Sequence, residues 1–179
     1  PATPAMLKVR HNSCTLGIDK DTLMSEELRS DRQIADFRMG QNKLGGNIVA
    51  DCSTDAQFTA LMEGALCGTW TTNVLKAGIL RKSFTMLRVF EDLGVAGTDK
   101  QFQAIKGCDI SGMEIKVATS KIATATFDVI GQTQAFGLTA VAVAGAGATL
   151  GNASTNSPMD AFTGAITEGG SAIHVVVEL

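Results

Sequence analysis

Residues 53–68 narrow what this chain can fold into more than any other stretch, because they alone have the hydrophobic spacing of an amphipathic helix. Apolar side chains recur there at intervals of three and four, which places them on one stripe of a helix. They are Phe58, Leu61, Met62, Ala65 and Leu66. Thr54, followed three residues later by Gln57, predicts the N-cap, and Gly68 predicts a left-handed stop, so we expect a helix over 54–67. Most of the remaining chain alternates with a period of two, which predicts a mainly β protein with one flanking helix.

Three shorter stretches are typical of strands. Residues 13–19 alternate cleanly between apolar and polar side chains, and residues 82–90 are rich in β-forming side chains. Residues 43–50 predict another strand, with a kink at Gly45-Gly46. Trp70 follows the helix, and we expect this large aromatic side chain to pack against the sheet rather than to form a site.

The longest β signal is a pair of strands, residues 102–117 and 121–130, joined at 118–120. The hydrophobic phase of the first strand reverses near Gly112, which predicts a β-bulge. In the second strand, alternate residues are apolar and face inward, and the residues between them are polar. The inward residues are Ala123, Ala125, Phe127 and Val129. We expect a twisted hairpin with one dry and one polar face, whose borders are unpaired within one copy and pair with neighbouring copies.

Residues 21–40 carry the densest charge pattern in the chain. Their apolar residues are spaced five, six and three apart, which fits neither a helix stripe nor a strand. One interpretation is a solvated loop or short helix with internal ion pairs, which contribute little to stability when exposed. The other is an interface segment whose acids and arginines pair with another copy, because the arginine fork suits that task.

Composition argues against several classes of protein. A formal net charge of −3, 5% aromatic residues and no tyrosine disfavour a nucleic-acid binder, which needs clustered Lys or Arg and aromatic platforms. The four cysteines are scattered without a CxxC pair, so we interpret them as reduced thiols. No run approaches the ~18 apolar residues of a membrane helix, so we expect no membrane span.

The sequence contains no complete motif for catalysis or for cofactor binding. The two histidines, His11 and His174, have no metal-ligand spacing, and no GxSxG nucleophile turn or complete GxGxxG loop occurs. Adjacent acids such as Glu26-Glu27 have the pattern of solvated surface charge. We therefore predict that the protein is not an enzyme and that it binds no cofactor or metal.

Taken in order, several segments match one known family. They are Asp21-Thr-Leu-Met-Ser-Glu-Glu-Leu-Arg-Ser-Asp-Arg-Gln-Ile34, Gly45-Gly46, the helix over 54–67, Gly68-Thr-Trp70 and Lys82-Ser-Phe-Thr-Met86. This series resembles the tail tube (major tail) proteins of long-tailed bacteriophages. The resemblance covers residues 9–134, and the run from Ser25 to Ile34 is its most specific part.

The resemblance implies a β-sandwich or barrel-like subunit with a flanking helix and a long hairpin. Such subunits would form six-fold rings that stack into the hollow tail tube of a siphophage-like virion, through which the genome passes into the host. The implied partners are other copies of the chain, the tape-measure protein and genomic DNA in the lumen, and the terminator and baseplate or tip proteins at the ends. The protein would be made in the host cytoplasm and would reside in the virion tail.

The resemblance also implies roles for individual residues. The polar side of the long hairpin would face the lumen with Asp109, Ser111, Glu114, Lys116, Thr124, Thr126 and Asp128. The charged segment would contact other subunits or rings through Ser25, Glu26, Glu27, Arg29, Asp31, Arg32, Asp36 and Arg38. Residues 1–134 would form the β core, and the Gly/Ala/Thr-rich linker and last strand of 135–179 would complete the same domain.

Two alternatives remain open at this stage. A tail terminator, a baseplate protein or a ring of a secretion tube would have the same fold but would cap rather than polymerise. A monomeric β-sandwich binding module, which is a different class, would use the segment Arg29–Arg38 to bind an acidic ligand.

Overall fold

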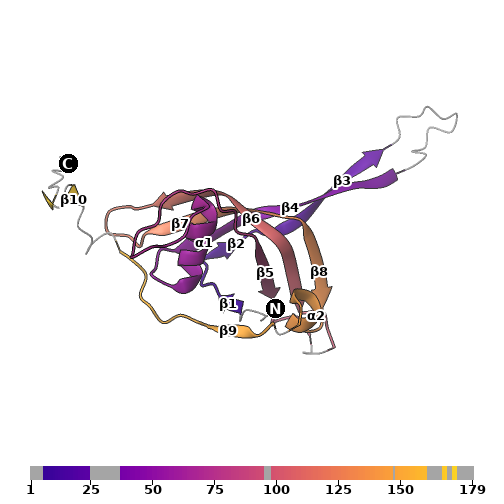
Figure 1. Cartoon of the computed structure of the whole chain (residues 1–179). Helices are drawn as coiled ribbons and strands as arrows, with labels where there is room; N and C mark the ends of the chain where they lie inside the picture. The colour runs from indigo at the N-terminus through magenta and orange to yellow at the C-terminus, as the bar shows by residue number, and fades with distance from the viewer. Residues whose placement is uncertain are drawn as a thin grey trace.

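A single curled sheet organises the chain (Figure 1). The computed structural model describes residues 6–24, 37–94, 98–146, 148–160, 167–168 and 171–172. Within them, seven strands form the main sheet in the order β2-β4-β7-β6-β5, with β3 also paired to β4 and β8 also paired to β6. These strands are β2 (Ser13–Cys14), β3 (Gly17–Met24), β4 (Phe37–Asp51), β5 (Phe84–Val89), β6 (Phe102–Lys116), β7 (Thr124–Gly131) and β8 (Thr133–Gly137). The prediction of a mainly β fold with few helices is confirmed.

The long hairpin predicted from the sequence is β6 and β7. They pair antiparallel from Asp109 opposite Ile130 to Lys116 opposite Thr124, and the register shifts between Ile110 and Gly112. This shift is the predicted bulge, with Ser111 as its extra residue. It keeps the inward face apolar on both sides of the bulge, because Ile110, Met113 and Ile115 all lie opposite inward residues of β7.

One part of the hairpin prediction is wrong, because the outer border of β7 is not open. Residues 44–51 of β4 pair antiparallel with residues 124–131 of β7 along its whole length. This pairing leaves no local pattern in the sequence, because the helix and two other strands separate β4 from β7 along the chain. β7 is therefore a central strand, which explains why Phe127 and Ala125 are fully buried.

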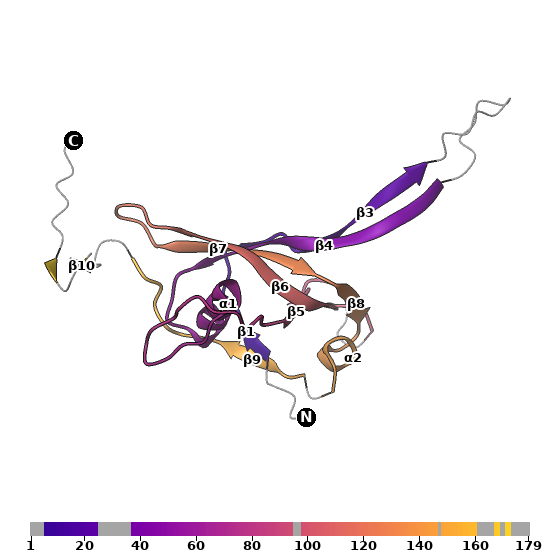
Figure 2. The ribbon, with the colours of Figure 1, turned by 45° about the horizontal axis from the view of Figure 1, so that its top comes forward.

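The charged segment is also partly different from the prediction of a loop or short helix. Residues 21–24 belong to β3 and residues 37–40 belong to β4, and these strands pair antiparallel from Gly17 opposite Gly45 to Met24 opposite Phe37. The far half of this hairpin projects from the body as a two-stranded arm (Figures 1 and 2). We call residues 19–24 and 37–43 the arm. Its sequence has no strand periodicity, because most of its side chains are exposed on both faces.

Helix α1 (Ala56–Leu66) confirms the predicted helix with shorter bounds and different ends. Asp55 rather than Thr54 is the N-cap, and Cys67 rather than Gly68 adopts the left-handed conformation, with φ 50°. Gly68 is needed for another reason, since a Cβ there would lie 2.1 Å from the carbonyl oxygen of Lys76. The helix lies on the inward face of the sheet, where the ring of Phe58 meets that of Phe127 edge-on at 5.6 Å between centroids.

The core extends beside the helix because the sheet curls. A second cluster of buried residues joins Leu44 and Ile48 of β4 with Ile105 of β6 and Val129 of β7. The two borders of the sheet approach each other, since the guanidinium of Arg88 on β5 donates to the carbonyl oxygen of Leu16, between β2 and β3. The result is the curled half-barrel seen in Figure 2.

The segment after β8 is more ordered than a linker. It contains α2 (Ala140–Ala144) and β9 (Leu150–Ala153), and β9 pairs parallel with β1 (Met6–Lys8), near the start of the chain. Residues 154–160 then run past the start of α1, where the hydroxyl of Ser154 donates to the Asp55 carboxylate at 2.5 Å. Further along, β10 (Thr167–Glu168) and β11 (Ser171–Ala172) form a short hairpin, and the predicted last strand at 173–179 lies outside the described residues.

Candidate assembly surfaces

The outward face of the β6–β7 hairpin carries the polar residues that the sequence assigned to it. The register places Glu114 opposite Thr126, Lys116 opposite Thr124, and Gly112 opposite Asp128. Helix α1 covers the opposite face, through Phe58 and Leu61. The Glu114 and Lys116 side chains are exposed and form an ion pair at 3.1 Å. The structure thus brings these residues onto one polar surface of a sheet whose other surface is core.

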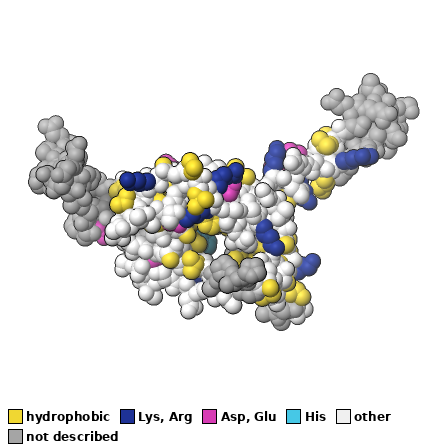
Figure 3. Space-filling model, in the orientation of Figure 1, with side chains coloured by type: hydrophobic (Ala, Val, Ile, Leu, Met, Phe, Trp, Pro, Cys, Tyr) yellow, Lys and Arg dark blue, Asp and Glu magenta, His cyan; other side chains and the backbone are white. Residues whose placement is uncertain are grey.

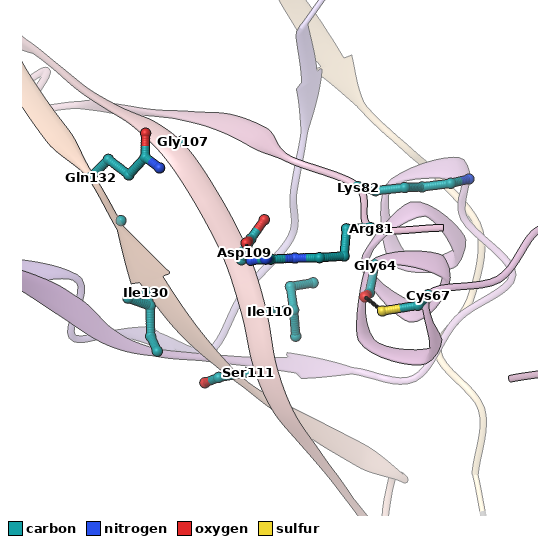
Figure 4. Close-up of a pocket in the computed structure, with 11 residues that line it drawn as sticks. Gly64, Cys67, Arg81, Lys82, Gly107, Asp109, Ile110, Ser111, Ile130 and Gln132 are labelled. Atoms are coloured by element: carbon teal, nitrogen blue, oxygen red, sulfur yellow. Dashed lines mark hydrogen bonds and ion pairs between the residues drawn. The ribbon is translucent and has the colours of Figure 1, made fainter. Parts of the chain in front are cut away.

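The two remaining residues predicted for the lumen lie at the bulge. The hydroxyl of Ser111 donates to the backbone carbonyl of Asp128 at 3.3 Å. Asp109 forms an ion pair with Arg81, which comes from the segment between α1 and β5 (Figure 4). Both residues line a cavity of about 300 Å³ between β6 and the end of α1.

That cavity is lined by groups that already bind one another. Arg81 holds Asp109, and the ammonium of Lys82 binds the carboxylate of Glu63 at 2.6 Å. Glu63 also accepts the backbone N–H of Trp70 at 2.8 Å. These donors lower the pKa of Glu63 below its ordinary value, with the Lys82 hydrogen bond as the largest cause. The arrangement fastens the segment after α1 to the helix, which is a structural role.

Trp70 belongs to the same fastening. Its indole N–H donates to the carbonyl oxygen of Thr59 at 3.3 Å, so the side chain is hydrogen bonded to α1.

Open strand edges are a surface that the sequence analysis only partly anticipated. On the side of β6 away from β7, residues 102–108 pair with β5, but residues 109–116 have no strand partner in the described part of the chain. β3 likewise pairs only with β4 among the described strands. An open row of backbone N–H and C=O groups is a template for another strand.

The arm adds exposed apolar side chains to these open edges (Figure 3). Leu23 is 61% exposed, and Met24 and Met39 are each 62% exposed. Met39 lies opposite Thr22, which is two residues from Met24, so the two methionines share one face of the arm. The alternation at 37–39 is the one signal in the sequence that could have indicated this part of the strand.

Most of the predicted interface residues lie outside the described residues: Ser25, Glu26, Glu27, Arg29, Asp31, Arg32 and Asp36. Arg38 is described: it is exposed, and it lies opposite Leu23 on the arm. Nearby, the ammonium of Lys43 binds the carboxylate of Asp21 at 2.7 Å, which raises the pKa of Lys43.

The described residues hold no group of three or more His, Cys, Asp and Glu side chains placed to bind a metal. All four cysteines are free thiols, and burial raises the pKa of Cys52 and of Cys108. In the part of the chain that the structure describes, neither helix has the length and apolar character needed to span a membrane.

A family comparison gives these surfaces their context. The family model described as phage tail tube protein matches residues 1–179, the whole chain. This chain belongs to the phage tail tube protein family. Membership makes it a structural protein of the virion tail that assembles with itself into a tube. A comparison with curated proteins gives no match. For a tail tube protein, the open edges and the arm are the surfaces that matter most, because assembly depends on what one copy offers to the next.

Proposed function

We propose that copies of this chain join through their open sheet edges into six-fold rings, and that the rings stack into the hollow tube through which the phage genome passes. The observation that carries the proposal is the ribbon β3-β4-β7-β6, in which, among the described strands, β3 is open on one border and residues 109–116 of β6 are open on the other. Its four strands alternate in direction. Because four is even, the β6 of one copy runs antiparallel to the β3 of the next copy around a rotation axis, so the sheet can continue without a break.

The two open edges are offset along the strand direction, as a tilted barrel requires. Residues 109–116 of β6 are aligned, through β7, with residues 45–51 of β4, whereas β3 is aligned with residues 37–45 of β4. Closing a sheet into a barrel requires strands to tilt and the register to stagger. The offset between the edges is therefore what a closed ring of such ribbons needs. Closure also removes the exposed edges of each copy.

The polar face of the ribbon would then line the bore. Helix α1 covers the other face, so the uncovered face is the one available to the lumen. The lumen residues predicted on β6 and β7 include three acids, Asp109, Glu114 and Asp128, of which Asp109 pairs with Arg81 and Glu114 pairs with Lys116. A bore with this balance would not hold DNA by attraction to its phosphates. The tape-measure protein would occupy the same bore before the genome, and terminator and baseplate or tip proteins would close the ends.

The charged segment from Ser25 to Asp36, together with Arg38, would contact other copies in the same ring or in the next one. Its charges of both signs and its arginines suit such contacts. The finished protein would reside in the tail of a siphophage-like virion after synthesis in the host cytoplasm.

Negative-stain imaging of the purified protein tests the proposal. We expect long hollow rods. Isolated rings that never lengthen would instead indicate a terminator, baseplate or secretion-tube ring, and small monodisperse particles would indicate a monomeric binding module.

A charge reversal tests the arm within the same assay. Arg29→Glu together with Arg32→Glu should prevent rods while the circular dichroism spectrum keeps its β signature, because the reversed charges repel their partners. Rods of ordinary length from this variant would contradict the role given to the arm.

A further inference from the structure

Arg81 reaches across the open border of β6 within a single copy. β5 pairs with β6 on the side away from β7, and Phe84 at the start of β5 lies opposite Cys108. The next residue of β6, Asp109, is the first of the open segment 109–116. Arg81 lies just before β5, so its guanidinium reaches Asp109 from the β5 side, as Figure 4 shows. The ion pair therefore spans the border at which a further strand would have to join.

A cavity of about 300 Å³ lies where that strand would enter. Arg81 and Lys82 line it from the chain before β5, and β6 contributes Asp109 and Ser111. Paired strands lie about 4.8 Å apart, so a strand added beside residue 109 would occupy the space that the Arg81 side chain crosses. The Arg81 side chain has to move before a strand can pair there.

The fold does not depend on this ion pair. The Arg81 side chain is 78% exposed, and the Asp109 side chain is 32% exposed. Ion pairs that solvent reaches contribute little to stability. The chain before β5 is already fastened by the next residue, because Lys82 binds Glu63 at 2.6 Å where both side chains are largely buried. What remains distinctive about the Arg81–Asp109 pair is its position across an open edge.

Open edges of sheets need protection before they meet their partner. Natural proteins protect such edges with charged side chains, bulges or loops, because an unprotected edge pairs with other available strands. The β6 edge has two of these devices side by side, the bulge at Ser111 and the charged pair at Asp109. We propose that the Arg81–Asp109 ion pair is a latch, which covers the β6 edge in a dispersed copy and opens when the β3 strand of the next copy pairs with residues 109–116. This inference rests on the proposed function and adds the regulation of that same edge.

The latch slows the first steps of assembly more than the later ones. Each junction of the first ring forms only after one ion pair opens, so the cost recurs around the ring. A copy that joins an existing assembly gains several contacts at once, and one ion pair is a small part of their sum. The latch therefore lengthens the lag before tubes appear and changes their final amount little.

Light scattering during assembly of the purified full-length chain tests the latch. We expect Arg81→Gln to shorten the lag about threefold or more in low salt, because an exposed ion pair is weak but is opened at every junction. At about 1 M NaCl, where charges are screened beyond about 3 Å, the native chain and the variant should have the same lag. A variant lag that equals or exceeds the native lag in low salt would overturn the inference, since Arg81 would then be neutral or would itself strengthen the junction.

Two further variants separate the ion pair from a change in net charge. Lys106→Gln removes one positive charge from an exposed residue in the part of β6 that β5 and β8 already cover, so its lag should equal the native lag. Arg81→Asp should shorten the lag as Arg81→Gln does. Adding Asp109→Arg to Arg81→Asp should restore the native lag, because the pair is remade with its charges exchanged. If the exchanged pair keeps the short lag, pairing across the edge does not delay assembly and the inference is wrong.

The native chain separates failure of the inference from failure of the proposed function. If it forms no tubes, the proposed function is wrong and the inference fails with it. If it forms tubes with the same low-salt lag as Arg81→Gln, tube assembly stands and only the latch is overturned. The circular dichroism spectra of the two should match, because the Arg81 side chain is exposed and outside the core.

Discussion

Gly46 shows how one residue allows two segments of the chain to cross closely. The sequence predicted a kink at Gly45-Gly46, and the structure has at Gly46 a backbone conformation that favours glycine. Gly46 has φ +147°, and a Cβ there would lie 2.6 Å from the backbone carbonyl oxygen of Thr15. The chain between β2 and β3 thus crosses directly over Gly46, at a separation that any side chain would prevent.

Gly46→Ala should destabilise the folded protein by roughly 2–4 kcal/mol, because the new methyl group meets backbone that cannot move aside and the φ angle disfavours an L-residue. Gly17→Ala is the matched control, since its nearest neighbour is 3.7 Å away, in ordinary contact. Urea unfolding followed by circular dichroism measures both variants. Equal free energies of unfolding for the two would contradict this account of the crossing.

Glu63 gives a second prediction, which depends on pH. Its pKa is lowered in the folded state, so its contribution to stability is complete above the ordinary carboxyl pKa and is lost as the pH falls through the folded value. Glu63→Gln should lower the free energy of unfolding by roughly 1–2 kcal/mol at pH 7, and the difference from the native chain should vanish in acid.

Glu114→Gln is the control for this experiment. Its ion pair with Lys116 is 61% and 67% exposed, so the substitution should cost less than about 0.5 kcal/mol. Urea titrations at pH 7 and at acid pH measure both variants. If the difference in the free energy of unfolding between the native and Glu63→Gln proteins increased as the pH fell, the pKa of Glu63 would be raised on folding rather than lowered, and the prediction would be wrong.

At the scale of elements, the sequence predicted those features that leave a period in the chain. Helix α1 and the β6–β7 hairpin each bury one face, so their apolar residues recur with periods of 3.6 and 2. The bulge was visible because it reverses that phase. The polar residues of the hairpin were placed on one face by the same parity, before any pairing was known.

Two features of the fold leave no periodic pattern in the sequence. The arm has two solvated faces, so Asp19, Lys20 and Asp21 follow one another without alternation. The pairing of β4 with β7 is a long-range contact that local pattern does not encode, and for that reason the border of β7 was wrongly expected to be open. The open edge of β6 is likewise defined only by which strands lie beside it.

The arm allows assembly to be separated from folding. Leu23→Ser with Met39→Ser should change the free energy of unfolding by no more than about 0.5 kcal/mol, because both side chains are exposed in a single copy. The same variant should stay dispersed at concentrations where the native chain associates, as sedimentation velocity would report. Leu44→Ser on the same strand is the contrasting control: Leu44 is 6% exposed, and its loss should cost roughly 2–5 kcal/mol.

At the scale of the whole molecule, hydrogen exchange should distinguish the interior of the sheet from its borders. β7 is paired on both sides, so its amides should exchange slowly in dispersed copies and in tubes. Residues 109–116 of β6 and 17–24 of β3 should exchange faster when dispersed and become protected on assembly, because neighbouring strands would cover them. Mass spectrometry of peptides from both states measures this, and unchanged exchange at both borders would contradict edge-to-edge closure.

The continuity of β4 has a mechanical consequence. One unbroken strand passes from the arm into the body, where its inner half is bonded to β7 over eight residue pairs from Leu44 to Asp51. A pull on the arm along its own axis therefore loads those bonds in shear, all together, instead of peeling them one at a time. Tension applied at the arm would reach the middle of the sheet without passing through a loop, which suits a filament that must bear load along its length.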